Sequence, residues 1–225
     1  MRILIVAATA MEVAPLLARL GSAALENSRI RSCSHASHEI DVLTAGVGMV
    51  AASAWTSKAL AERHYDAALN VGICGSFDPA FGPASVVHVV TDRMSELGAE
   101  DGDAFIHFEA LNLPDDGLSG PKAPCVHAKR IENAALDALP AVAGVTVNAV
   151  HGNERSIADV VARFRPQVES MEGAGFMFAC ATHGLPFAQV RSVSNMVERR
   201  NRSAWRIPEA VASLTPIVLQ IVETL

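Results

Sequence analysis

The feature that most constrains the fold of this chain is the alternation of short apolar runs with helical segments. The first run, residues 2–8, is rich in β-branched residues, which is typical of a strand buried on both faces. Thr9 and Glu12 follow it as a capping box, which predicts the start of a helix that closes at Gly21. This order repeats along the chain without a linker-like segment, so we predict one α/β domain over residues 1–225.

The remaining elements are predicted from the same patterns. Residues 22–38 are polar and are expected to hold an edge strand and turns, and the acidic, glycine-rich residues 93–121 are expected to form a long loop. The expected strands are 41–45, 67–71, 85–91, 145–150 and 187–194, and the expected helices are 50–63, 127–139, 157–165, 173–183 and 207–225.

The composition limits the kind of partner that this chain can have. Its net charge of −6 opposes binding to nucleic acid or to an anionic membrane, since neither contact would release counterions or gain surface attraction. No apolar run reaches the length of about 20 residues that a membrane span needs. The four cysteines are scattered without a CxxC pair, which favours a reducing compartment. We therefore expect a cytoplasmic, soluble protein.

Polar side chains stand at several predicted strand ends. The segment Val168–Gly175 ends a strand, begins a helix and carries Glu172 at the junction, although an acidic residue there also suits the helix dipole. Glu12, Gly75-Ser76 and Asn195 occupy similar positions, and such positions converge on one crevice in a mostly parallel sheet. Two carboxylates and an amide, without a metal or a nucleophile, suit hydrolysis by an activated water, the logic of glycosyl transfer.

Other site types find weaker support. The stretch Gly46–Ala51 matches the dinucleotide pattern GxGxx(G/A), but Asp66, the acidic residue at nearly the right spacing, precedes the next strand instead of ending it. His35 and His38 lie near Cys33, yet no HExxH or paired CxxC accompanies them, so no metal site is expected. A nicotinamide oxidoreductase and a noncatalytic binding module remain open alternatives.

Several short motifs, in order along the chain, together resemble a known family. They are Ala8–Val13, Ala45–Gly48, Asn70–Gly72, Ser170–Ala174 and Arg191–Asn195. The set resembles the nucleoside phosphorylase superfamily, specifically its hydrolytic branch with the methylthioadenosine/S-adenosylhomocysteine nucleosidases. Glu96–Gly102 and Ser194–Trp205 are most similar to the futalosine hydrolases, which act on the way to menaquinone. The resemblance implies a three-layer α/β/α fold with a central twisted mixed sheet, and a homodimer or larger homo-oligomer.

The resemblance also implies roles for individual residues. Glu12 takes the position of the carboxylate that activates water, and Met171 with Glu172 takes the position of the pair that holds the ribose, with Ser170 and Gly75 beside them as substrate-binding residues. Asn195 stands where the family has an acid at the purine. An amide offers one donor group and one acceptor, which matches the O6 and N7–H of a departing 6-oxopurine better than the two donors of adenine. Asn195 therefore favours hypoxanthine or guanine over adenine, and hypoxanthine is the base of futalosine.

We expect the protein to hydrolyse the N-glycosidic bond of a purine nucleoside, with futalosine as the preferred substrate. No cofactor and no metal are expected. The first strand–helix junction carries Glu12 and no basic residue before Arg19, whereas a phosphorylase would need a cation for phosphate. A methylthioadenosine/S-adenosylhomocysteine nucleosidase or a purine nucleoside phosphorylase is the alternative. Futalosine carries a carboxylated aromatic arm, and the candidates to bind its carboxylate are Arg199, Arg200 and Arg202. Phe105 or Phe108 is the candidate for an apolar wall beside the arm, and Arg155 is the candidate for stacking on the purine. Trp205 is a candidate for packing on the terminal helix.

Overall fold

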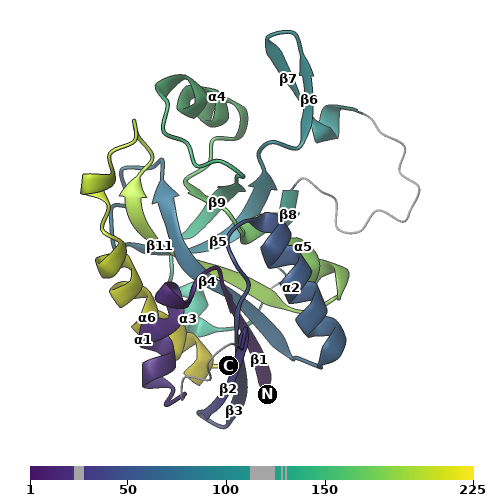
Figure 1. Ribbon diagram of the computed structural model, residues 1–225, viewed down its shortest axis with the longest axis vertical. Helices are drawn as coiled ribbons and strands as arrows, with labels where there is room; N and C mark the ends of the chain where they lie inside the picture. The colour runs from purple at the N-terminus through teal and green to yellow at the C-terminus, as the bar shows by residue number, and fades with distance from the viewer. Residues whose placement is uncertain (23–27, 112–124, 128, 130) are drawn as a thin grey trace.

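The computed structural model describes residues 1–22, 28–111, 125–127, 129 and 131–225 of the chain (Figure 1). The strands are β1 Arg2–Ala7, β2 Ile30–His35, β3 His38–Thr44, β4 Ala67–Ser76, β5 Val86–Met94, β6 Gly98–Asp101, β7 Ala104–His107, β8 Cys125–His127, β9 Ala141–Thr146, β10 Val168–Ser170 and β11 Phe187–Met196. The α-helices are α1 Ala10–Arg19, α2 Met49–Glu62, α3 Ala134–Asp137, α4 Glu154–Phe164, α5 Gly173–Thr182 and α6 Ile207–Glu223. Two 3₁₀ turns, η1 Phe108–Leu111 and η2 Arg202–Ala204, complete them.

The main sheet is mixed and runs in the order β10-β9-β5-β11-β4-β1-β3-β2, with β8 added to β5. The pairs of β1 with β3, of β1 with β4 and of β4 with β11 are parallel, whereas β5 and β11 are antiparallel. Strand β10 pairs with β9 on one side and with β4 on the other. Five strands, β4, β11, β5, β9 and β10, therefore close into a ring, and this curvature brings the ends of β4, β10 and β11 together.

Helices cover the open part of the sheet on both faces, which gives three layers (Figure 1). The alternation of side chains along β1 shows how the layers form: Ile3 and Ile5 pack with α1, α3 and α6, whereas Leu4 and Val6 pack with α2 and α5. Because β1 is buried on both faces, it reads as a continuous apolar run. The three-layer α/β/α architecture with a mixed central sheet is confirmed. No helix in the described part of the chain is long and apolar enough to cross a membrane.

The structure corrects some predicted elements. The helix predicted for residues 127–139 is wrong, because β8 ends at His127 and, of the residues that the structure describes in this range, only the single turn α3 is helical. The strand predicted at 145–150 is displaced, since β9 ends at Thr146. Part of the loop predicted at 93–121 is ordered as the β6–β7 hairpin, which stands away from the main sheet in Figure 1, while 112–124 lie outside the described residues.

The strand predicted at 67–71 is longer in the structure, since the glycine-containing segment Gly72–Ser76 that follows it is also strand. Strand β4 extends to Ser76 because β11 pairs with it along that whole length and β10 pairs with its last two residues. Interstrand hydrogen bonds therefore override the local turn preference of the two glycines.

Candidate active site

One cavity lies at the carboxyl ends of β1, β4, β10 and β11, and its volume is about 250 Å³. The six residues to which the sequence analysis gave a catalytic role or a role at the ribose or purine all line this cavity: Glu12, Gly75, Ser170, Met171, Glu172 and Asn195. Ser76, the neighbour of Gly75, does not line it, since its hydroxyl instead bonds the carbonyl groups of Asp78 and Gln167. The expected convergence of strand ends is therefore observed for the six assigned positions.

Glu12 combines a structural contact with exposure to the cavity. Its Oε2 accepts hydrogen bonds from the backbone N of Thr9 at 2.8 Å and from the Thr9 hydroxyl at 2.9 Å, which confirms the predicted capping box. Its Oε1 accepts a third bond, at 3.1 Å, from the backbone N of Ile73 in β4. The side chain is 5% exposed. Since every one of these partners is a donor, the site is built for a carboxylate.

Glu172 is the N-cap residue of α5 and is held from two sides. Its Oε1 accepts a hydrogen bond of 3.1 Å from the backbone N of Gly48, and its Oε2 lies 3.5 Å from Nη1 of Arg191. Gly46 and Gly48 adopt positive φ angles of 101° and 99°, which glycine alone tolerates easily. The GxGxx(G/A) stretch therefore presents a backbone N–H to Glu172, a role other than the dinucleotide turn considered from sequence.

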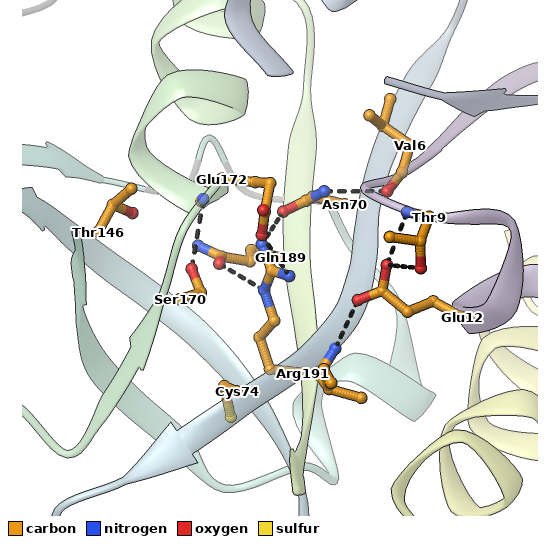
Figure 2. A network of polar contacts seen from close by, with 12 residues as sticks. Val6, Thr9, Glu12, Asn70, Cys74, Thr146, Ser170, Glu172, Gln189 and Arg191 are labelled. Carbon is orange, nitrogen blue, oxygen red and sulfur yellow. Dashed lines mark hydrogen bonds and ion pairs between the residues drawn. The ribbon is translucent and has the colours of Figure 1, made fainter. Parts of the chain in front are cut away.

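Arg191 is the centre of a buried polar network beneath the cavity (Figure 2). Its Nε donates to Gln189 at 2.9 Å, and its Nη2 donates to the Oδ1 of Asn70. Asn70 in turn donates to the carbonyl of Val6 at 2.9 Å. The guanidinium is fully buried, so its charge is balanced locally by Glu172 and hydrogen bonds instead of by water. This network fixes Glu172 relative to three strands.

Asp92 extends the same network towards α5. Its carboxylate accepts hydrogen bonds of 2.9 Å from Gln189 and from Thr146. Burial raises the pKa of Asp92 to about 6, although these two donors and the charge of Arg191 act in the opposite direction. Thr146 also accepts a 2.7 Å bond from the backbone N of Ala174, so the start of α5 is anchored to the network.

Glycines allow the charged groups and α5 to approach closely. A Cβ atom on Gly72 would lie 2.6 Å from Nη1 of Arg191 and 2.7 Å from Oε1 of Glu12. A Cβ on Gly173 would lie 2.1 Å from the Oδ2 of Asp92. A Cβ on Gly175 would lie 2.3 Å from the carbonyl of Met49 in α2. Side chains at these positions would separate the charged groups or push α5 away from its neighbours.

Asn195 lies at an irregularity in β11. The pairing register with β4 shifts between Val193 and Asn195, a bulge that re-aims the side chain. The Oδ1 of Asn195 accepts a 2.8 Å bond from the hydroxyl of Ser194, and its Nδ2 donates to the carbonyl of Met196 at 2.9 Å. Since a carbonyl can only accept, the amide orientation is defined, and one N–H and one lone pair stay available to a ligand.

The cavity also contains residues that the sequence analysis did not assign. Glu169 and His151 line it and form a pair, with the imidazole Nδ1 2.6 Å from the Glu169 Oε2. Trp205, predicted to pack on the terminal helix, lines the cavity as well, and the guanidinium of Arg200 lies 5.5 Å from its ring centre. The sequence did contain a signal for two of the residues around the cavity. Glu169 is a charged residue in a short β-prone segment, and Arg191 is a charged residue within the mostly apolar run 187–193.

Other candidates from the sequence lie outside this cavity. Arg155 is exposed, and Phe105 packs under Arg163 at 4.7 Å on the β6–β7 side of the molecule. Phe108, in η1, and Arg202, in η2, do not line the cavity either. Arg199 and Arg200 line a separate open groove of about 780 Å³ between α4 and residues 197–201.

Comparison with known proteins identifies the family. The family model of the Phosphorylase superfamily matches residues 2–223. The futalosine hydrolase of Streptomyces coelicolor is 37% identical over 190 residues, which are 79% of this chain and 76% of the relative. That of Acidothermus cellulolyticus is 33% identical over 176 residues, 77% of this chain and 71% of the relative. This chain is a member of the futalosine hydrolase family of the phosphorylase superfamily. Membership makes it an N-glycosyl hydrolase.

Solved structures agree with this family at the level of the fold. The native structure of futalosine hydrolase from Helicobacter pylori matches with a TM-score of 0.84 at 17% identity, and covers 100% of this chain and 98% of that one. A mutant nucleosidase from Helicobacter pylori, solved with 5'-methylthioadenosine in its active site, gives a TM-score of 0.84 at 18% identity and covers 100% of this chain and 99% of that one. Hydrolases of both types therefore share the architecture of this futalosine hydrolase family member.

Proposed function

We propose that this enzyme hydrolyses the N-glycosidic bond of futalosine and releases hypoxanthine and dehypoxanthine futalosine, a step towards menaquinone. The observation that carries the proposal is the charge of the cavity. Three carboxylates, Glu12, Glu169 and Glu172, line it, and none of its described lining residues is lysine or arginine. A phosphate nucleophile would meet Glu12 without a cation on the cavity wall to bind it, because Arg191 is buried behind the wall and paired with Glu172, whereas water gains a base. The futalosine hydrolases among the relatives support the choice of substrate.

The proposed roles follow from the contacts of each side chain. Glu12 accepts a proton from water as the oxygen attacks the anomeric carbon of the ribose. Glu172 accepts hydrogen bonds from the sugar hydroxyls, and Met171, with Ser170 and Gly75, forms the wall beside them. The carboxylates also stabilise the positive charge that develops on the sugar as the bond to the purine breaks. Asn195 pairs with the 6-oxopurine through its free N–H and lone pair.

The carboxylated arm of futalosine has a natural path out of the cavity. Trp205 lines the cavity and Arg200 covers its ring, while Arg200 and Arg199 line the neighbouring groove. We propose that Trp205 packs on the aromatic part of the arm and that Arg200 binds its carboxylate. We expect Arg200→Gln to raise the KM for futalosine and to leave the KM for inosine, which lacks the arm, unchanged. Equal effects on both substrates would contradict this placement.

The assembly is proposed as a homodimer or larger oligomer. Exposed apolar side chains gather at the cavity mouth: Met11 is 53% exposed and Val47 58%, and Val50 on the following turn is 77% exposed. A second copy over this rim would bury them. We further propose that residues 1–225 act as one catalytic domain in the cytoplasm, consistent with free cysteines such as Cys74 and Cys180.

The deciding experiment is a base-release assay with futalosine, inosine and methylthioadenosine, each with and without phosphate. We expect hypoxanthine release from futalosine at a rate independent of phosphate, together with a free reducing sugar. Strict dependence on phosphate would make the protein a phosphorylase. Preferred release of adenine would favour the nucleosidase alternative. Binding without release of base would indicate a noncatalytic module.

A further inference from the structure

The reaction proposed above requires a proton donor, and Asn195 cannot serve as one. When the bond between the anomeric carbon and N9 breaks, its electron pair moves onto the purine, and a proton on N7 makes hypoxanthine a neutral leaving group. A side-chain amide can hydrogen-bond the base, but it has no proton to release near neutral pH. Another acidic group close to Asn195 must therefore protonate the base.

The pair of His151 and Glu169 is such a group. The imidazole Nδ1 lies 2.6 Å from Oε2 of Glu169, and the backbone N of His151 donates to Oε1 at 3.1 Å. Glu169 is 4% exposed, and both side chains line the cavity. The contact between Nδ1 and this carboxylate fixes the orientation of the imidazole ring. The Nε2 atom has no hydrogen-bond partner among the described residues, so it is free to meet a substrate.

The pair lies next to Asn195 across one glycine. Gly75 of β4 is paired with Asn195 of β11 on one side and with Glu169 of β10 on the other. A Cβ atom on Gly75 would lie 3.4 Å from Nδ2 of Asn195 and 3.4 Å from Cγ of Glu169. The two side chains therefore flank the same small gap. Since Asn195 is the proposed partner of the purine, His151 and Glu169 stand at the purine end of the cavity.

The other two carboxyl groups that line the cavity are engaged elsewhere, and burial raises the pKa of the remaining titratable group, the Cys74 thiol, so that it is a poor acid near neutral pH. Glu12 faces three donors and is the proposed base for water. Glu172 is bound by the backbone N of Gly48 and faces Arg191. Both groups are thus set up as carboxylates at the sugar end. Imidazole has an ordinary pKa of about 6.5 and can both hold and release a proton near neutral pH.

We propose that His151, held by Glu169, protonates the departing 6-oxopurine. The proton on Nε2 moves to the lone pair of N7 as the bond from the anomeric carbon to N9 breaks, and the electron pair of that bond stays on the purine. Only after this transfer does N7–H donate to Oδ1 of Asn195, whose N–H faces O6 throughout. The water oxygen bonds to the anomeric carbon and gives its proton to Glu12. Return of one proton from Glu12 to His151 through solvent restores the enzyme, so the net reaction consumes one water. This inference rests on the proposed hydrolysis of futalosine.

The test compares two leaving groups. Futalosine needs a proton on N7, whereas N7-methylated futalosine carries a positive charge already and releases a neutral base without one. For His151→Gln we expect kcat for futalosine to fall about 10²–10⁴-fold, the usual contribution of a general acid, and kcat for the methylated substrate to fall less than tenfold. Glu169→Gln should show the same selectivity with a smaller loss. The remote, exposed His64 supplies the matched control, His64→Gln, with both rates unchanged.

The possible outcomes separate the claims. Equal losses on both substrates would mean that the pair only anchors residues 147–153, and the inference would be wrong. Wild-type rates in His151→Gln would overturn it as well. If the variant does not fold, Glu169→Gln on the two substrates decides by the same criterion. Failure of the wild-type enzyme to release hypoxanthine from futalosine would instead remove the proposed function, and the inference with it.

Discussion

Replacing Glu12 by glutamine separates the catalytic role of this carboxylate from its structural role. In the wild type both carboxylate oxygens accept from donors: Thr9 N–H and hydroxyl on one side and Ile73 N–H on the other. In Glu12→Gln the amide oxygen can keep the Thr9 contacts, but the NH₂ group then faces the N–H of Ile73. A buried donor without a partner costs about 1–3 kcal/mol. For a chain of this size, each kcal/mol lowers Tm by roughly 2–4 °C.

In Glu12→Gln the loss of activity should be much larger than partial unfolding of the variant could cause. Without a base for water we expect kcat to fall about 10²–10⁴-fold, while the Kd for a C-nucleoside such as formycin B, which cannot be hydrolysed, changes little. The measurements are hypoxanthine release, thermal unfolding and calorimetric binding. Thr9→Ala is the control, because it removes one contact of Glu12 and keeps the carboxylate; we expect a stability loss of about 1 kcal/mol and less than a tenfold loss of kcat. Turnover within threefold of wild type in Glu12→Gln would refute water activation by this residue.

Three further perturbations test other parts of the site. Asn195→Asp should shift the ratio of hypoxanthine to adenine release towards adenine by about 10–100-fold, since one mismatched buried contact costs about 1–3 kcal/mol; an unchanged ratio would contradict the pairing argument. Gly72→Ala should lower kcat strongly, because the new methyl would overlap Arg191 and Glu12, and normal turnover would show that both can shift without consequence. Burial raises the pKa of Asp92 from 3.8 to about 6, so the folded state binds more protons between these values, and the wild type should lose roughly 2 kcal/mol relative to Asp92→Asn as pH rises from 4 to 6. Urea unfolding of both proteins measures this difference, and a constant difference over that range would rule it out.

The sequence predicted most of the architecture because its signals are local. The apolar run 2–8, the capping box at Thr9 and Glu12, and the alternating segments were sufficient for an α/β chain with polar groups at strand ends. Local signals failed where tertiary contacts, above all pairing between strands, decided the secondary structure. The segment Gly72–Ser76 became strand through β10 and β11, and among the described residues of 127–139 only the short α3, beside α6, is helical.

By itself, the sequence determined the family and the set of polar residues at the strand ends, since motif order and spacing are properties of the chain alone. The tertiary structure decided which groups face each other. Arg191 meets Glu172 and Asn70 only because the closed ring of strands brings them together, and Gly72 lets that guanidinium approach Glu12. The charge state and reach of a buried side chain depend on neighbours distant in sequence, and no local pattern records them.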